Sequence, residues 1–385
     1  MKKSNQKSKT IIKSNNNNIN LKLNEIKSPK ELKIFKKIIQ EENYDLILFK
    51  SVYDLILIVF INKKGSLVSY NLIDNKKIVE IININKHINE LKHYLDKNNK
   101  RDLVSLISMA ENNIKIWNFN TLECIINLNF NIGNFFLNLN SICFLNNDKN
   151  LYLIASSVHM PQTQLIHVYN LRGEKIKEIN DNKLQNYFLG SFYDSKFSKN
   201  YIIISTNADI RAFDYNENKV VKKFVPVNEQ PIKETKIHDI EANRRLHFPD
   251  NHIIRLVKYS EGPRYIIIKK CGNITKLLAG MKENSIKIWD FHSTQLLGEI
   301  AISKSTLKSI CLWDEENLLV GTSSGLKLID LDKNKLVKNF LDIVDINRMD
   351  ICTIPKYGKC LITANYKEIN LWINKNLKKN KNGIF

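Results

Sequence analysis

An alternating apolar strand that ends on a large side chain recurs seven times along the chain. The clearest copies are S-I-K-I-W-D at 285–290 and N-I-K-I-W-N at 113–118, in which isoleucines alternate with polar residues. Alternation with a period of two predicts a β-strand with one buried face. The large residues that close the seven copies are Tyr70, Trp117, Tyr169, Phe213, Trp289, Ile329 and Trp372.

The spacing of these strands is nearly regular. The closing residues lie 47, 52, 44, 76, 40 and 43 positions apart, and all but the long interval fit the period of roughly 40 to 45 residues of a propeller blade. A short β-rich run precedes each copy, as in L-V-S-L-I-S-M-A at 103–110, and a more polar strand follows, as in L-E-C-I-I-N-L-N at 122–129. The sequence therefore predicts an all-β fold, a seven-bladed β-propeller of four-stranded antiparallel blades.

The last unit has three predicted strands, ending with E-I-N-L-W-I at 368–373, and then runs into Asn- and Lys-rich sequence. The segment E-L-K-I-F-K-K-I-I at 31–39 precedes the first complete unit, which begins near Tyr44. Because closure of the ring removes exposed sheet edges, we expect this N-terminal segment to be the missing strand of the last blade. An amphipathic helix over 31–39 is the alternative interpretation.

These motifs resemble the tryptophan-aspartate (WD) repeats of the β-propeller family of that name, over roughly residues 31–374 and best around Trp117 and Trp289. His87 lies four residues before Leu91, as the family's turn histidine does, and Glu111 and Glu283 stand where the family has a tight-turn Asp. The family's hydrogen-bonded His, Ser, Asp and Trp tetrad is incomplete in each unit that can be aligned. The resemblance implies that His87 and the seven closing residues are structural, with rings packed between blades and each Trp N–H in a structural hydrogen bond.

The charge is distributed unevenly. The net charge is +20, but residues 1–40 hold eleven Lys and two Glu, and residues 374–385 hold four Lys and no acid, so the excess lies mainly in the tails. Residues 1–28 have no apolar periodicity and are expected to be a disordered basic Asn/Lys-rich tail. We expect the propeller over 29–374 and a basic C-terminal tail over 375–385. Lys, Asn and Ile are abundant throughout, as codon bias in an AT-rich genome would produce, which weakens any functional interpretation of a single Lys or Asn.

The long interval between Phe213 and Trp289 predicts an insertion. An ordinary blade there needs residues 265–291 and one strand before them, which leaves about 226–251 between a fourth strand and the next first strand. In WD-repeat proteins such connections lie on the face that makes most partner contacts. The insertion contains Arg244, Arg245, His247 and Phe248, a cationic and aromatic mixture typical of interface anchors, so we expect them to bind a partner. A disordered loop under weak selection is the alternative.

Motifs of catalysis and metal binding do not occur in the sequence. The eight His show no H-x-H or H-E-x-x-H spacing, and there is no P-loop, G-x-S-x-G or G-x-G-x-x-G. The six Cys form no C-x-x-C pair, which favours reduced thiols in the cytoplasm or nucleus rather than secretion. No stretch reaches the roughly 20 apolar residues of a membrane-spanning helix. We therefore expect a non-enzymatic scaffold or adaptor that binds other proteins, without a cofactor or a metal.

Two other classes of binding protein stay open. Arg244-Arg245 invites comparison with phosphoinositide-binding propellers, whose site resembles a Phe- or Leu-Arg-Arg-Gly motif, although Asn243 and Leu246 flank the pair here. The lysine-rich tails would attract nucleic acid, but they contain almost none of the aromatics used in specific recognition. The sequences W-D-F-H at 289–292 and W-N-F-N at 117–120 lack the Arg of the W-D-x-R motif, which argues against docking on a ubiquitin ligase in that mode.

Overall fold

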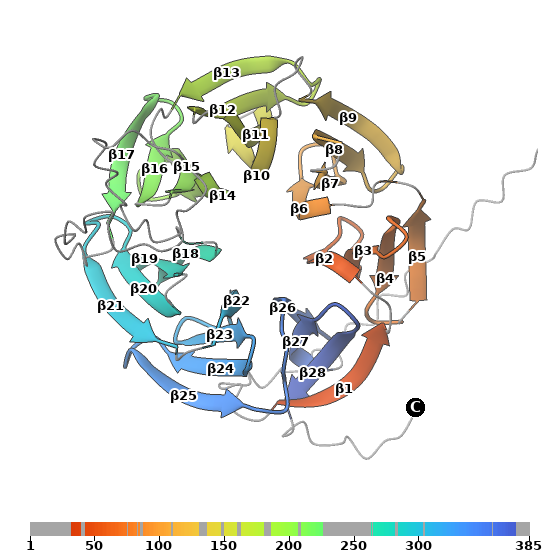
Figure 1. Cartoon of the computed structure of the whole chain (residues 1–385), viewed down its shortest axis with the longest axis vertical. Coiled ribbons are helices and arrows are strands. Elements are labelled where there is room, and N and C mark those ends of the chain that lie inside the picture. The colour runs from red at the N-terminus through yellow and green to blue at the C-terminus, as the bar shows by residue number, and fades with distance from the viewer. Residues whose placement is uncertain are drawn as a thin grey trace, which may run out of the picture.

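The described part of the chain is built entirely from β-strands, in a computed structural model. The structure describes residues 32–374 apart from 40–42, 75, 83, 85–87, 109–110, 131–136, 148–149, 160–162, 181–185, 207–208, 226–262, 264, 282–283, 303–304 and 356. Within these ranges, no helix is long and apolar enough to cross a bilayer. Seven four-stranded antiparallel sheets stand around a common axis, so the predicted seven-bladed β-propeller is confirmed (Figure 1).

Each blade is one sheet whose strands follow one another outward from the axis (Figure 1). Blades 1 to 3 consist of β2 (Asn43–Lys50), β3 (Ile56–Asn62), β4 (Leu67–Asn71) and β5 (Lys76–Ile81); β6 (Ile88–Asp96), β7 (Arg101–Ser108), β8 (Asn113–Asn118) and β9 (Glu123–Asn129); and β10 (Leu137–Asn147), β11 (Asn150–His159), β12 (Thr163–Asn170) and β13 (Lys175–Asn180). Blades 4 and 5 consist of β14 (Asn186–Asp194), β15 (Lys199–Thr206), β16 (Ile210–Asp214) and β17 (Lys219–Phe224); and β18 (Tyr265–Cys271), β19 (Ile274–Gly280), β20 (Ser285–Asp290) and β21 (Leu296–Ala301). Blade 6 consists of β22 (Leu307–Leu312), β23 (Asn317–Thr322), β24 (Gly325–Asp330) and β25 (Lys335–Phe340).

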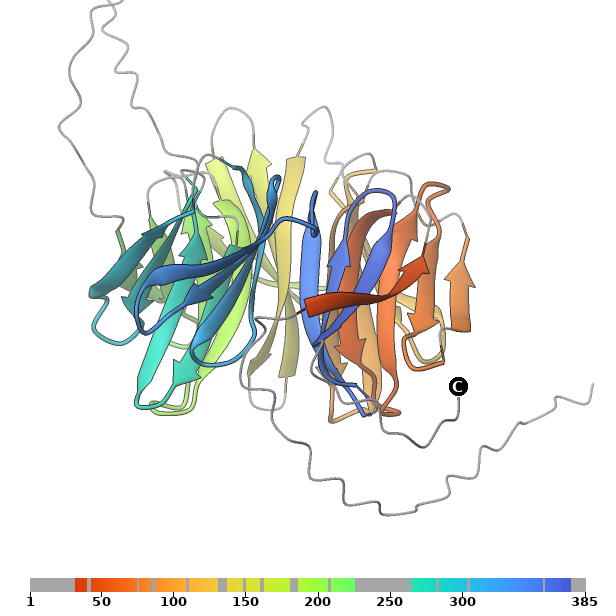
Figure 2. The ribbon, with the colours of Figure 1, turned by 90° about the horizontal axis from the view of Figure 1, so that it is seen from below.

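Blade 7 is completed by the N-terminal strand, as the sequence predicts. Its order is β26 (Arg348–Ile354), β27 (Gly358–Ala364), β28 (Ile369–Asn374) and then β1 (Leu32–Ile39), which pairs antiparallel with β28 on the rim of the ring (Figures 1 and 2). Leu32 is buried in the cluster that contains Trp313 and Trp372, and Lys37 Nζ contacts Glu368 Oε2 at 2.7 Å. The helical alternative for 31–39 is wrong, because this segment satisfies its backbone groups in the sheet.

The hydrophobic core lies between the blades. Buried apolar residues in the described ranges form seven clusters, each shared by two neighbouring blades. Each closing residue of the sequence repeat belongs to, or packs against, the cluster that joins its blade to the preceding one. In order of these clusters around the ring, the residues are Tyr70, Trp117, Tyr169, Phe213, Trp289, Ile329 and Trp372. These side chains therefore lie at the interfaces between neighbouring blades.

The predicted hydrogen bond of the Trp N–H is made in blade 7 but not in blade 2. Trp372 faces Leu361 on the second strand, and its Nε1 donates to Thr363 Oγ1 at 2.8 Å. Trp117 Nε1 is buried without a partner in the described structure, so the expectation is wrong for this residue. The position that corresponds to Thr363 on β7 is Leu106, which has no hydroxyl group.

The fifth blade begins later than the sequence spacing suggests. Its first strand, β18, starts at Tyr265, so the extra strand expected before that residue is not part of the blade. The prediction of an earlier strand is wrong because residues 265–291 contain only the first three strands of the blade. The fourth strand follows them and extends to Ala301. The connection from β17 to β18 therefore runs from Val225 to Arg264, longer than the predicted insertion at 226–251, which lies outside the described residues.

Each innermost strand lies next to the axis (Figure 1), and one residue of each belongs to a set that we call the ring residues. These residues are defined by strand register. In six blades, the ring residue pairs with a residue of the second strand, and this residue lies three positions after the one that pairs with the closing residue. In blade 1 the corresponding position falls in the bulge before Leu46. In blade order the ring residues are Asp45, Glu90, Ser141, Phe188, Tyr265, Ser309 and Arg348. β-bulges lie at this level in blades 1 to 4 and in blade 6, where they re-aim the side chains.

Polar contacts within this ring connect one blade to the next. Asp45 accepts hydrogen bonds from Arg348 Nε at 2.8 Å and from the backbone N–H of Leu91 at 2.8 Å, and so links blades 7, 1 and 2. Ser141 donates to Glu90 Oε2 at 3.0 Å and accepts from the N–H of Leu189 at 3.1 Å, which links blades 2, 3 and 4. These contacts keep the ring residues satisfied and fix neighbouring blades against each other.

Asp350 on β26 is expected to make stability depend on pH. Burial raises the pKa of its carboxyl to about 6, and a 2.7 Å hydrogen bond from the N–H of Ile351 offsets this only in part. Because the folded-state pKa lies above the unfolded one, the protein loses stability as pH rises from about 4 to about 6. Asp350→Asn should therefore raise the unfolding free energy by about 1 to 2 kcal/mol at pH 7.5. This is less than the pKa shift alone implies, because the side chain is half-buried and solvent screens its charge.

Urea unfolding of parent and variant at several pH values tests this prediction. The stability difference should shrink toward zero as pH falls to about 4 and below, where the aspartate is protonated in the folded state and becomes protonated in the unfolded state as well. A difference that stays constant between pH 4 and pH 7.5 would contradict it.

Candidate functional site

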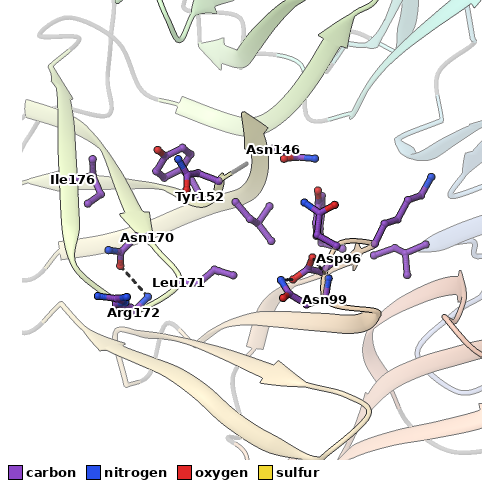
Figure 3. Close-up of a pocket in the computed structure, with 14 residues that line it drawn as sticks. Asp96, Asn99, Asn146, Tyr152, Asn170, Leu171, Arg172 and Ile176 are labelled. Carbon is purple, nitrogen blue, oxygen red and sulfur yellow. Dashed lines mark hydrogen bonds between the residues drawn. The ribbon is translucent and has the colours of Figure 1, made fainter. Parts of the chain in front are cut away.

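A cleft with a volume of about 960 Å³ lies between blades 2 and 3 (Figure 3). We call it the blade 2–3 cleft. It opens on the face formed by the turns between first and second strands and between third and fourth strands, here the turn face. The fourth strand of each blade ends, and the first strand of the next blade begins, on the opposite face, here the loop face, because successive strands alternate in direction.

The blade 2 wall is the end of β6 and the turn that follows it. Asp96 accepts hydrogen bonds from Asn99 Nδ2 and from Arg101 Nε, each at 2.8 Å. Burial tends to raise the pKa of Asp96, but these hydrogen bonds outweigh burial and hold the pKa below its ordinary value. Asp96 is therefore a charged, fully engaged carboxylate that fixes the turn. The turn also carries Lys97 and Asn98, both exposed.

The blade 3 wall is the turn between β12 and β13. Asn170 Oδ1 accepts from the N–H groups of Arg172 and Glu174 at 2.9 and 3.0 Å, an Asx turn that holds the backbone. Gly173 has φ +82°, and a Cβ there would lie 3.3 Å from Leu128 Cδ2. The tight turn presents Arg172 at the rim, and Asp96 and Asn99 lie across the cleft from Asn170 and Arg172 (Figure 3).

Aromatic and apolar side chains line the rest of the cleft. Burial, and secondly the Asp96 carboxylate, raise the pKa of Tyr94, so its phenol stays neutral. The Tyr152 ring lies 5.4 Å from that of Tyr215 in blade 4, which supports the wall from behind. Ile176 on the outer strand is 51% exposed at the edge. Such a surface suits the contact of an apolar group, next to hydrogen-bonding partners.

The titratable groups of the cleft hold fixed protonation states near neutral pH. Its one carboxylate, Asp96, is held ionised by Arg101, and burial and the Asp96 charge keep the Tyr94 phenol protonated, so neither is tuned to exchange a proton near neutral pH. Elsewhere in the described ranges, no three side chains of His, Cys, Asp or Glu come together as a metal site would require. Amide groups, cations and apolar side chains make up the rest of the cleft lining, and such groups can hold a ligand.

A second, smaller hollow of about 440 Å³ lies on the loop face beside the closure of the ring. Lys37 and Glu368 form an ion pair on one side of it, and the β25–β26 connection forms another side. Leu341, Val344 and Tyr366 beside it are 74%, 56% and 57% exposed. Exposed apolar side chains of this size near one hollow are typical of contact surfaces.

The predicted partner-binding residues are not among those that the structure describes. Arg244, Arg245, His247 and Phe248 fall in 226–262, and His87 falls in 85–87. The sequence does not reveal the cleft, because its residues lie in three separate turns and the strand ends beside them, between Tyr94 and Ile176. The signal available was a set of Asn-rich turns, N-N at 98–99 and 146–147 among them, which general Asn abundance obscured.

Comparison with known proteins adds no family to this geometry. Neither the scan of protein-family models nor the search of curated proteins gave a match to the chain.

Proposed function

We propose that this protein is a non-enzymatic interaction scaffold or adaptor that holds partner proteins on the faces of a rigid propeller. The observation that carries the proposal is the blade 2–3 cleft, which combines unpaired cations, amides and exposed apolar groups but no poised acid or base. Seven blades joined by buried clusters hold such surfaces in a constant geometry. The fold alone does not identify the partner, since propellers serve many functions.

The proposal includes a WD-repeat origin for the blades. The hydrogen bond from Trp372 to Thr363 joins the third strand to the second, as the Trp and Ser of the WD tetrad do, and it supports this relationship. The six free cysteines support an intracellular, reducing location, cytoplasmic or nuclear.

The insertion at 226–251 is proposed as a second contact region, with Arg244, Arg245, His247 and Phe248 as its anchors. Replacing 226–251 with a short Gly-Ser linker should leave circular dichroism and melting nearly unchanged, because the cost of loop closure varies slowly with length. Affinity purification followed by mass spectrometry should show lost partners. A matched Arg244→Ala/Arg245→Ala/Phe248→Ala variant of full length should lose the same ones.

Two results would count against this role of the insertion. Retention of every co-purifying protein by the linker variant would favour an unselected loop. Loss of association with phosphoinositide vesicles, with protein partners retained, would favour lipid binding through Arg244 and Arg245.

A further inference from the structure

We infer that the blade 2–3 cleft binds an acidic, extended segment of a partner protein, with carboxylates held by Lys97 and Arg172. This inference rests on the proposed scaffold function and names the chemistry of one partner. It also places that partner on the turn face.

The first observation is an imbalance of charge at the rim. Within the described structure, Lys97 and Arg172 are exposed and have no ion-pair partner, and they come from opposite walls of the cleft. The neighbouring cations are already matched: Arg101 Nε lies 2.8 Å from Asp96, and Lys175 Nζ lies 2.8 Å from Glu178. The two uncompensated cations therefore favour a ligand that brings its own negative charge to both walls.

The second observation is the set of hydrogen-bonding groups beside these cations. The side-chain amides of Asn98 and Asn150 line the cleft, are exposed and have no hydrogen-bond partner among the described residues. An amide both donates and accepts, which matches the backbone groups of an extended peptide. Asn99 and Asn170 are engaged within their own turns and so hold the walls in place.

The third observation is apolar surface at the same site. Ile176 is 51% exposed on the edge of the cleft, and Leu151, Leu171 and Tyr152 complete the lining. A volume of about 960 Å³ lies at the upper end of the range of roughly 300 to 1,000 Å³ for binding pockets. A peptide that alternates acidic and apolar side chains would match both properties, whereas a nucleic acid would leave the apolar edge unused.

The cleft is already shaped for a ligand. The blade 2 turn is held by the Asp96 network, and the blade 3 turn by the Asn170 hydrogen bonds and by Gly173. Rigid walls reduce the ordering that binding would otherwise require.

A charge-reversal pair with a matched control tests the inference on the full chain. The cleft variant is Lys97→Glu/Arg172→Glu, and the control is Lys64→Glu/Lys367→Glu, which changes net charge equally at exposed turns of the loop face. A random-peptide phage library is selected on the parent protein, and enriched peptides are measured by fluorescence anisotropy at physiological ionic strength. Enriched peptides should carry acidic residues beside apolar ones. They should bind the cleft variant about tenfold or more weakly and the control within about twofold.

Several results would overturn the inference. Equal weakening by both variants would show attraction to net charge, and enrichment of peptides without acidic residues would show a different ligand. If the cleft variant lost binding to poly(U) RNA or to phosphoinositide vesicles but still bound acidic peptides, the cleft would be a site for nucleic acid or lipid instead. A Lys97→Arg/Arg172→Lys variant should keep binding, since its charge is unchanged, and weak binding there would also contradict the assignment.

The scaffold function and this inference can fail separately. If proteins co-purify equally with the parent and the cleft variant, and acidic peptides do not bind, the inference about the cleft is wrong. The proposed scaffold function is still supported in that case. If the parent retains no proteins, the scaffold function itself is wrong.

Discussion

Trp289→Ala is expected to lower the unfolding free energy by about 3 to 5 kcal/mol, the range for truncating a buried large side chain. Trp289 is 1% exposed and belongs to the cluster that joins blades 4 and 5, where its ring meets Phe224 edge-on at 6.3 Å between centroids. Its removal leaves a cavity at a blade interface, which the neighbouring strands cannot close because the ring fixes their positions. Chemical or thermal unfolding measures the loss.

Ile274→Ala in the same blade is the matched control. Ile274 is 41% exposed, so the change should cost less than about 1 kcal/mol. Trp289→Phe should recover part of the stability by filling part of the cavity. Should Trp289→Ala melt within a degree of the parent, the ring would not be part of the core and the architectural role of the repeat would be wrong.

Deletion of residues 1–39 is expected to make the protein insoluble or much less stable, whereas deletion of 1–28 should leave the fold intact. The longer deletion removes β1, so β28 loses its antiparallel partner and becomes an exposed edge in the last blade. It also removes Leu32 from the cluster shared by blades 6 and 7. Soluble yield and melting temperature of the two truncations test the difference.

A point variant separates closure from chain length. Leu32→Asp keeps every residue but places a charge where the side chain is 5% exposed, and it should destabilise the protein, while Leu32→Ile should be tolerated. Equal solubility of the two truncations, together with a stable Leu32→Asp variant, would remove the closure argument.

The fold class, the number of blades and the strand that closes the ring were predictable from the sequence. These features depend on local patterns: alternation marks a strand, and its recurrence marks a blade. Closure followed because a three-stranded last unit needs a partner for its edge, and 31–39 was the segment that could pair with it. The positions of the closing residues were predictable for the same reason, since a large apolar residue at a strand end must be covered by the neighbouring blade.

The side-chain contacts across blades became visible only in the folded structure. Thr363 is within reach of Trp372, and Leu106 stands at the corresponding place beside Trp117, a difference that depends on the register of paired strands. The polar ring around the axis likewise joins Asp45 to Arg348, 303 positions apart in sequence. The blade 2–3 cleft arises where the turns of two blades stand side by side. Such contacts are set by the angle and level at which closed blades pack, and a repeating sequence pattern carries no information about the gaps that remain between them.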